Sequence, residues 1–567
     1  MKKLLAVFLA VAMLLGCTAM AEVEVKEFPE VPADYSKVVD SANPLRTLYE
    51  GAYRVPVTVG EAERSMLVYF PASYAQTQGF VLIVPASGTS AAQCLEEGGW
   101  KVVADEQGML LMLPEPGEEA YDLSPDGADY AFLAACAKKA GERNYWFQTK
   151  GRDYIVGYGD GASLAVEYAE ATVNSWSGLV AFGDLNLTAE DIKNKSGADL
   201  PVWLFVSDAA EEEALIDLFR GYNGCTDEVF SSAVADRVYF PNQKTNDLLL
   251  NDQPLSQVRV TVAADAAAYV ADRAAQAYDF LHIGTREVGY GAKAMRYAFN
   301  VDEWGATVET VDVDGITRSW IQYVPSKLRE TAEGKVPLLV ALHGNALNGE
   351  YYAERSGFIR MAEEFGFIIA FPTGSISNGI TPTWNITKDE TKWNDVAFLE
   401  AMIAKIESEQ PIDTARRYLF GHSMGGMFSQ HLISYMDGVF AAVCATGCTT
   451  EAVTVGPYTH ETPIWIITGD NDLMGTSFQA PEVAHYIAMF REGNGLGEAY
   501  GQYRSGRYQH YVWRNAQGAD TLRFSLCDEM AHTTTLDQGL YFFNWLSQFS
   551  RGENGECIYQ GGIYNAK

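Results

Sequence analysis

Phe420-Gly421-His422-Ser423-Met424-Gly425-Gly426 is the stretch from which the fold of this chain is predicted. The residues just before it, 417–420, read as the end of a β-strand, and residues 427–433 read as a helix. A strand, a tight turn and a helix form the setting of a nucleophile elbow, in which glycines two residues either side of a serine leave room for the turn. The pattern therefore predicts that Ser423 presents its hydroxyl at the carboxyl end of a sheet.

A serine that attacks an acyl group needs hydrogen-bond donors for the oxyanion that forms. The amide of Met424 is expected to be one donor, because it lies at the predicted helix N-terminus. The amide of Asn345 is expected to be the second, since Leu342-His343-Gly344-Asn345 follows an earlier predicted strand at residues 338–342. Gly344 would permit the close approach.

The catalytic acid is expected after Pro463-Ile464-Trp465-Ile466-Ile467-Thr468, which reads as a buried strand. In hydrolases with a nucleophile elbow, the acid and the base follow the serine in the order Ser, Asp or Glu, His. The strand runs into Gly469-Asp470-Asn471-Asp472, which puts a carboxylate at a strand's carboxyl end. Asp472 is predicted to be the acid and Asp470 is the second choice, while either could simply cap the turn.

Three histidines follow this loop and are candidates for the base that Ser423 needs, because a free hydroxyl is a poor nucleophile at neutral pH. His485 falls in a helical segment and His510 in an alternating strand. His532 lies in a loop between a predicted strand and the last predicted helix, which is where the base is expected. His532 is therefore predicted to be the base, with capping of the last helix as the alternative.

The pattern around the elbow belongs to a larger repeat. From residue 44 onward, short apolar runs alternate with helical segments, which is typical of a parallel sheet. Five pairs of stretches match in the same order: 79–88 with 336–344, 111–117 with 369–374, 129–133 with 395–399, 154–161 with 418–425 and 200–205 with 462–467. We infer two copies of one α/β domain, at residues 44–290 and 291–567, each with a mostly parallel sheet flanked by helices.

The first copy lacks the residues that the chemistry requires. Its elbow reads Gly157-Tyr158-Gly159-Asp160-Gly161, so Gly159 stands where the serine would be. The position of the acid falls at Ala210, and the one histidine before residue 300, His282, matches the last helix rather than the base loop. This copy is predicted to be inactive by this mechanism, and the sequence leaves open whether it is a structural partner, a carbohydrate- or polymer-binding module, or a cover over the second site.

At this point the second copy, about residues 295–550, resembles the polyhydroxybutyrate depolymerase and feruloyl-esterase-like group, carbohydrate esterase family one of the α/β-hydrolases. The matching stretches are 338–345, 365–372, 393–399, 421–426, 462–472 and 531–532. The resemblance implies an exported serine esterase, with Ser423, Asp472 and His532 as the triad. Together with the repeat, it predicts two α/β-hydrolase domains. The run Asp-Asn-Asp-Leu-Met-Gly at 470–475 departs from the apolar, proline-containing run usual in the group, which puts the pocket wall in doubt.

Substrate contacts are predicted only in outline. His343 and His422 lie at the expected mouth of the site, where they would be structural or would contact substrate rather than act as bases. Trp384, in the predicted pocket loop 374–391, could stack on a sugar or phenolic ring, although ordinary packing would also explain it. The mechanism implies no metal and no organic cofactor.

The N-terminus predicts export. Met1-Lys2-Lys3 and the apolar run that follows, 4–16, have the features of a signal peptide at residues 1–21. Leu14-Leu15-Gly16-Cys17 resembles a lipobox that would leave a lipidated Cys17, and Ala19-Met20-Ala21 resembles an ordinary cleavage site. Residues 22–43 read as a leader or tether, so we expect an extracellular protein or one anchored by lipid at the cell surface.

Charge and cysteine content narrow the function further. The formal net charge is −33, which argues against binding to nucleic acid and against docking on anionic lipid other than through an anchor at Cys17. The 8 cysteines form no dense framework and are expected to be buried thiols, with a bridge between Cys448 and Cys527 as an alternative.

The combined prediction is an exported serine esterase whose partner is a polymer- or carbohydrate-linked ester of the feruloyl, acetyl or hydroxyalkanoate type. The alternatives are a non-catalytic exported binding protein, or a peptidase or acyltransferase on the same triad.

Overall fold

The computed structural model describes most of the chain between residues 23 and 560. The ranges not described there are 30–39, 41–46, 74–78, 125–126, 141–150, 243–253, 287–294, 331–333, 376–381, 388, 390–392, 449–452, 454, 473–477, 479 and 535–537. The predicted signal peptide, the lipobox cysteine and the predicted boundary at residue 290 lie outside the described residues.

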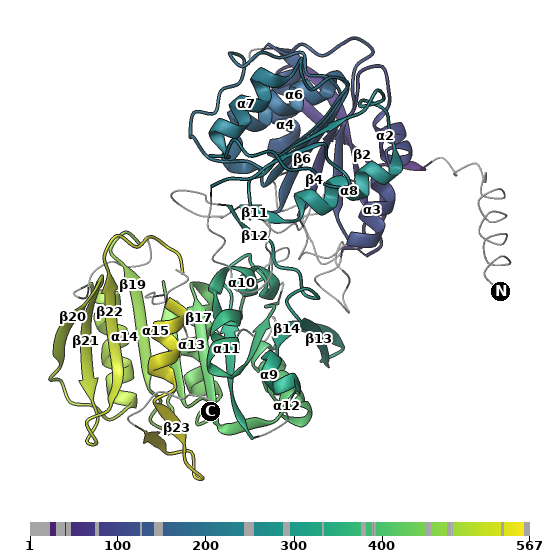
Figure 1. Cartoon of the computed structure of the whole chain (residues 1–567). Coiled ribbons are helices and arrows are strands. Elements are labelled where there is room, and N and C mark those ends of the chain that lie inside the picture. The colour runs from purple at the N-terminus through teal and green to yellow at the C-terminus, as the bar shows by residue number, and fades with distance from the viewer. Residues whose placement is uncertain are drawn as a thin grey trace, which may run out of the picture.

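The first copy, drawn purple to teal in Figure 1, is built on a ten-stranded sheet. The strand order is β1-β2-β3-β5-β4-β6-β7-β8-β10-β9, and the strands from β5 through β10 pair in parallel. The strands are β1 Val25–Glu27, β2 Gly51–Val59, β3 Ala62–Phe70, β4 Phe80–Val84, β5 Leu110–Pro114, β6 Asp153–Tyr158, β7 Gly178–Phe182, β8 Val202–Val206, β9 Arg237–Tyr239 and β10 Val258–Val262. The helices are α2 Ala91–Glu97, α3 Trp100–Gln107, α4 Ala128–Ala140, α6 Asp160–Ala171, α7 Glu213–Tyr222 and α8 Ala271–Leu281.

The second copy, green to yellow in Figure 1, has another ten-stranded sheet, β13-β14-β16-β15-β17-β18-β19-β22-β21-β20. From β13 to β21 it repeats the order of the first sheet from β2 to β9, whereas β1 and β20 are edge strands without a counterpart. Its strands are β13 Ala306–Val313, β14 Ile316–Tyr323, β15 Val336–Leu342, β16 Ile368–Pro372, β17 Ile412–His422, β18 Ala442–Thr446, β19 Ile464–Gly469, β20 Gly501–Ser505, β21 Tyr508–Arg514 and β22 Asp520–Cys527. Its helices are α9 Ser326–Glu330, α10 Gly349–Ser356, α11 Phe358–Phe365, α12 Asp395–Glu409, α13 Met424–Tyr435, α14 Pro481–Gly493 and α15 Gln538–Leu546. The predicted fold class, two α/β-hydrolase domains with mostly parallel sheets, is confirmed.

The central strands are apolar throughout because both faces of each sheet are covered. In β15, Leu338, Val340 and Leu342 belong to the core on one face, and Leu339 and Ala341 belong to the core on the other. A strand buried on both sides cannot alternate apolar and polar residues, which explains the continuous apolar runs in the sequence.

Two two-stranded ribbons lie outside the large sheets. β11 (Gly284–Arg286) pairs antiparallel with β12 (Met295–Tyr297) at the junction of the copies, and β23 (Phe549–Arg551) pairs with β24 (Cys557–Tyr559) near the end of the described chain. The expected tether at 22–43 needs one correction, because Val25–Glu27 pairs in parallel with β2 and extends the first sheet. None of the helices in the described part of the chain has the length and hydrophobicity needed to cross a bilayer.

Candidate active site

Ser423 is the single residue between strand β17 and helix α13. Its backbone has φ 54° and ψ −119°, a conformation that a residue with a side chain adopts at a cost. The flanking glycines make this turn possible, since a Cβ on Gly421 would lie 2.1 Å from the carbonyl oxygen of Gly425, and a Cβ on Gly425 would lie 2.3 Å from that of Leu342. The Ser423 amide donates to Thr446 O on the neighbouring strand β18 at 2.8 Å, which fixes the turn against the sheet.

His532 and Asp472 come from the ends of adjacent parallel strands. Asp472 follows β19, His532 follows β22, and these two strands pair directly, so both loops emerge at the same edge of the sheet. His532 Nε2 lies 2.8 Å from Ser423 Oγ, and His532 Nδ1 lies 2.9 Å from Asp472 Oδ1. The Asp472 side chain is fully buried, so its hydrogen bond to the ring is shielded from water.

The other candidates lie elsewhere. Asp470 is exposed, two residues before Asp472. His485 is exposed on α14. His510 is buried in β21, where its Nδ1 lies 2.7 Å from Ser525 Oγ and burial lowers its pKa to about 4. The structure therefore brings Ser423, Asp472 and His532 together and leaves the second choices apart from them.

The loop after β15 approaches the elbow closely. A Cβ on Gly344 would lie 3.3 Å from Ser423 Cβ, and Asn345 lines the pocket next to the serine. Met424 begins α13. The two residues whose amides are predicted to receive an oxyanion thus belong to the two backbone segments beside Ser423.

His422 lies on the pocket wall, with its ring centre 4.9 Å from that of His532. Burial, together with the neighbouring His532, lowers the pKa of His422 to about 3, so its ring is neutral at physiological pH. Its Nδ1 lies 3.2 Å from Thr446 Oγ1.

Of the two roles considered for His343 and Trp384, structural support and contact with substrate, the geometry fits structural support, because both side chains are buried and neither lines the pocket. His343 is fully buried, its Nε2 accepts from the amide of Gly374 at 2.8 Å, and burial lowers its pKa to about 4. Trp384 donates through Nε1 to His343 O at 2.8 Å and stacks on Phe428 at 5.0 Å. Both side chains hold the loop that carries Gly344, because Trp384 bonds to the backbone of His343 and His343 Nδ1 lies 2.7 Å from Gly344 O.

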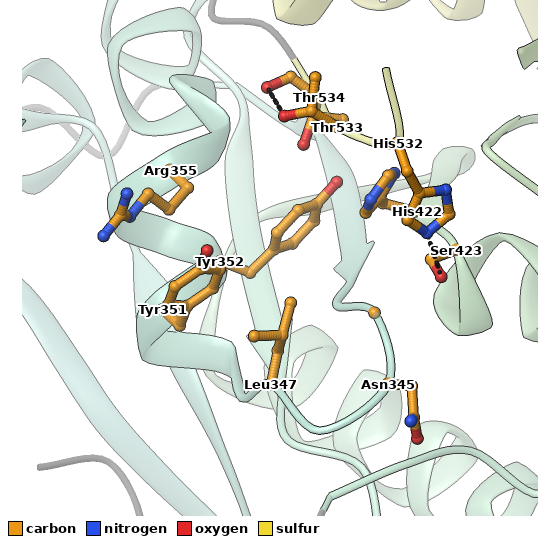
Figure 2. A pocket seen from close by; sticks show the side chains of 11 residues that line it. Asn345, Leu347, Tyr351, Tyr352, Arg355, His422, Ser423, His532, Thr533 and Thr534 are labelled. Carbon is orange, nitrogen blue, oxygen red and sulfur yellow. Dashed lines mark hydrogen bonds between the residues drawn. The ribbon is translucent and has the colours of Figure 1, made fainter. Parts of the chain in front are cut away.

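A pocket of about 290 Å³ opens beside Ser423 (Figure 2). It is lined by residues of the loop after β15, of α10, of the elbow and of the His532 loop: Gly344, Asn345, Leu347, Tyr351, Tyr352, Arg355, His422, Ser423, His532, Thr533 and Thr534. The Tyr352 ring extends from α10 toward the elbow, with its hydroxyl toward His422 and His532 (Figure 2). The sequence analysis did not predict that α10 lines the pocket, although the position of this helix directly after the Asn345 loop indicates it.

The seven described cysteines are free thiols, so the bridge considered between Cys448 and Cys527 does not form. Cys448 Sγ instead accepts from Gln430 Nε2 at 3.2 Å behind the elbow. The described residues contain no group of three or more His, Cys, Asp or Glu side chains that could hold a metal ion. The expectation of a metal-free mechanism stays a prediction.

Residues 319–455 match the family Esterase PHB depolymerase. The match confirms the predicted resemblance to the polyhydroxybutyrate depolymerase and feruloyl-esterase-like group. It covers about a quarter of the chain and includes Ser423 and Asn345, whereas Asp472 and His532 lie beyond its end.

Curated relatives point to the same esterase group. The bifunctional acetylxylan esterase/xylanase XynS20E of Neocallimastix patriciarum is 36% identical over 122 residues, which is 21% of this chain and 16% of that protein. The putative esterase NocK of Nocardia uniformis subsp. tsuyamanensis is 26% identical over 173 residues, 29% of this chain and 48% of that protein. The chain thus spans less than half the length of either relative.

Among solved structures, an acetyl xylan esterase from Aspergillus awamori is similar with a TM-score of 0.32 and 16% identity, over 42% of this chain and 98% of that one. A ferulic acid esterase gives a TM-score of 0.31 and 16% identity, over 42% and 94%.

The first copy keeps the elbow of the esterase-like copy without its chemistry. Gly159 has φ 57° and ψ −129°, close to the backbone of Ser423. Where a Cβ on Gly447 would lie 3.1 Å from the His532 ring, a Cβ on the corresponding Gly183 would lie 3.2 Å from Cβ of Ala267. An alanine therefore lies beside the first elbow where the second has a histidine.

The position of the oxyanion site is also filled in the first copy. By strand register, Ser87 corresponds to Asn345 and Asp160 corresponds to Met424. The Asp160 carboxylate accepts from the amides of Ser87 at 2.9 Å and Tyr121 at 3.1 Å. The Asp160 carboxylate thus already accepts from the Ser87 amide, the counterpart of the Asn345 amide that a substrate oxyanion would use.

Proposed function

We propose that the second copy is an exported serine esterase that hydrolyses carboxylic esters through an acyl-enzyme on Ser423. The observation that supports this most directly is the hydrogen-bonded chain from Ser423 Oγ to His532 Nε2 and from His532 Nδ1 to Asp472. The strained turn at Ser423 adds support, because backbone strain at a single residue concentrates at functional sites. The match to the Esterase PHB depolymerase family makes esters the substrate class to test first.

In the first step, Ser423 Oγ attacks the ester carbonyl carbon and its proton passes to His532 Nε2. The negative charge that forms on the carbonyl oxygen is received by the amides of Met424 and Asn345. The tetrahedral intermediate collapses, His532 returns the proton to the leaving alkoxide, and the alcohol departs. Water then attacks the acyl-serine with His532 as base, which releases the acid and restores the hydroxyl.

Asp472 supports both steps by charge and orientation. Its carboxylate accepts from Nδ1–H of His532, so the proton-free Nε2 faces Ser423. When the ring becomes imidazolium, the buried carboxylate stabilises the positive charge. His422 is a poor rival for the base, because burial holds its pKa at about 3 and its ring lacks the link to Asp472.

The substrates proposed are polymer- or carbohydrate-linked esters with an acyl group small enough for the pocket beside Ser423. Its volume of about 290 Å³ is at the lower end of small-molecule sites. A panel of acetylated xylan, feruloylated sugar, short hydroxyalkanoate ester and peptide would separate esterase from peptidase specificity. Cleavage of the peptide alone would contradict an esterase.

The central test is turnover of p-nitrophenyl acetate by the full chain and by Ser423→Ala. The substitution is expected to lower kcat by roughly 1,000-fold or more, because it removes the nucleophile. Ser408→Ala, on the exposed end of α12, is the matched control. Equal rates for wild type and Ser423→Ala would reject the proposal and favour a non-catalytic binding protein.

Export is proposed from the N-terminal sequence, and its test is separate. Mass spectrometry of protein expressed in a bacterial host should find a chain that begins at Cys17 with lipid attached, or at Glu22 without it. A full-length chain retained in the cytoplasm would contradict export and leave the esterase proposal untouched.

A further inference from the structure

Helix α10 lies between the two copies, on the side of the second copy that faces the β11–β12 ribbon (Figure 1). Asn348 caps its start by accepting from the amide of Tyr351 at 2.8 Å, and Gly357, with φ 70°, ends it after eight residues. A helix this short is only marginally stable in isolation. Its position therefore depends on what packs against its two sides.

One side of α10 is held by a buried arginine of the first copy. Arg152, just before β6, donates to Glu350 Oε1 at 2.7 Å and to Glu354 Oε2 at 3.0 Å. The two glutamates are four residues apart, so they project from the same face of the helix. Arg152 also donates to Phe299 O at 2.9 Å, and the amide of Phe299 donates to Glu354.

This group of charges excludes water. Arg152 is 3% exposed and Glu354 is 2% exposed at their side chains. Burial by itself would lower the pKa of Arg152, but Glu350 and Glu354 outweigh it and leave that pKa above its usual value. Burial would likewise raise the pKa of Glu354, but Arg152 and Arg355 outweigh it and leave that pKa below its usual value. Removal of either partner would leave a buried charge uncompensated.

A second tie runs from the helix to the ribbon. Arg355 donates to Arg286 O at 2.7 Å and to Thr285 Oγ1 at 3.2 Å. The amide of Arg286 donates in turn to Gly151 O at 2.8 Å, next to Arg152 in the chain. Gly151 allows this approach, since a Cβ there would lie 2.8 Å from Arg355 NH2. Figure 2 shows the Arg355 guanidinium directed away from Ser423.

The opposite side of α10 forms the wall of the active-site pocket. Tyr352, two residues from both Glu350 and Glu354, packs on Phe371 and Phe420 of the sheet and is 1% exposed. Its hydroxyl points toward His422 and His532 (Figure 2). One rigid turn of helix therefore connects the ion pairs of the first copy to the pocket of the second.

We propose that the first copy acts as a positioning body for the esterase site, with Arg152 as the positioning residue that holds α10 and, through it, Tyr352. The inference rests on the proposed esterase function of the second copy. It gives a role to a copy whose own elbow has no serine and whose oxyanion position is filled by Asp160. Arg152 does not line the pocket, so it acts on substrate binding through α10 and Tyr352, which form the pocket wall.

The test uses Arg152→Met in the full chain, with two aryl esters that share a leaving group, p-nitrophenyl acetate and p-nitrophenyl ferulate. Feruloyl is the larger acyl group and is expected to extend to the wall that Tyr352 forms, whereas acetyl is expected to stay beside Ser423. We expect KM for the ferulate to rise roughly 10-fold with kcat within about twofold, and both constants for the acetate to stay within about twofold. Arg152→Lys keeps the charge and is expected to restore part of the ferulate affinity.

Arg64→Met is the matched control, because it breaks another arginine–carboxylate pair of the first copy, Arg64 with Asp129 at 2.6 Å, which makes no contact with α10 among the described residues. Concentrations are normalised by titration of Ser423 with a fluorophosphonate, so a smaller folded fraction does not imitate a kinetic effect. Unchanged constants in Arg152→Met, or the same changes in Arg64→Met, would overturn the proposal.

A second readout needs no activity. Amide hydrogen exchange over residues 349–356 is expected to be faster in Arg152→Met than in wild type and unchanged in Arg64→Met. If the wild type neither turns over esters nor reacts with the fluorophosphonate, the esterase proposal fails, and the exchange result still decides whether Arg152 holds α10. Should Arg152→Met not fold, Glu350→Gln removes one charge of the Arg152 pairs at similar volume and is expected to give the same shifts at smaller size; normal exchange there would overturn the proposal.

Discussion

Replacement of Asp472 by asparagine tests the proposed triad most sharply, because the chain provides its own control two residues away. Asp472 is buried and lies 2.9 Å from His532 Nδ1, while Asp470 in the same loop is exposed. Asparagine has the size of aspartate, so Asp472→Asn removes the charge with little change in packing. Asp470→Asn makes the same chemical change where no ring is in contact.

The magnitude follows from the geometry. A carboxylate and an imidazolium with charge centres about 4 Å apart interact by about 4 kcal/mol at an effective dielectric constant of about 20. Each 1.36 kcal/mol of lost transition-state stabilisation lowers the rate about tenfold, so kcat should fall by roughly 1,000-fold. The asparagine amide can also donate to Nδ1 and thereby place the ring proton on Nε2, which blocks Ser423 and extends the expected loss to about 10,000-fold.

The assay is kcat for p-nitrophenyl acetate at pH 7 to 8, with thermal unfolding as a check that both variants fold. Asp470→Asn is expected to stay within about twofold of wild type, because surface charges contribute little. A loss below about tenfold in Asp472→Asn would refute the role given to this carboxylate. A large loss in Asp470→Asn with little in Asp472→Asn would move the acid to the exposed residue.

Three further predictions concern the turn, the first copy and pH. Gly425→Ala should destabilise the second copy by about 1 to 3 kcal/mol and abolish turnover, since the new Cβ would lie 2.3 Å from Leu342 O. Gly497→Ala, which has open space around it, should change neither stability nor turnover. A stable, active Gly425→Ala would contradict the geometry of the elbow. Gly159→Ser should not create fluorophosphonate labelling at residue 159 of a Ser423→Ala chain, because Ala267 lies beside Gly183 where the second copy has His532 beside Gly447, and the Asp160 carboxylate holds the amide of Ser87; labelling there would show that the first copy retains a working base. Partly buried His282 and fully buried His343 have pKa values lowered to about 4, from about 6.5 when unfolded, so the unfolded chain binds more protons and the midpoint of thermal unfolding should fall as pH drops from about 6.5 to 4. His510→Gln, at a site with the same lowered pKa, should flatten that slope while exposed His485→Gln should not, and equal slopes in the two variants would count against burial as the cause.

Much of the fold was predictable because it depends on patterns among residues close together in the sequence. Buried parallel strands appear as continuous apolar runs, the elbow has its glycines at fixed offsets, and the repeat shows the same order of strands twice. The choice of Asp472 and His532 followed from chain order and from their place after predicted strands. The structure brings both to Ser423, because β19 and β22 are neighbours whose carboxyl ends meet at one edge.

Other features were left open or missed where exposure or packing decides. For His343 and Trp384 the sequence left substrate contact and structural packing open, and the structure buries both side chains against the loop after β15. The strand at Val25–Glu27 was missed because three residues carry almost no periodic signal and gain their hydrogen bonds from β2.

By itself, the sequence determined two copies of an α/β-hydrolase domain, with a serine elbow in one and a glycine in its place in the other. These features depend on residues close together in the chain, where steric limits and hydrophobic periodicity act directly. Only the tertiary structure revealed that Arg152 meets Glu350 and Glu354, and that α10 connects these charges to the pocket beside Ser423. Ion pairs between residues some 200 positions apart leave no local pattern in the sequence, because their partners come together only in the tertiary structure.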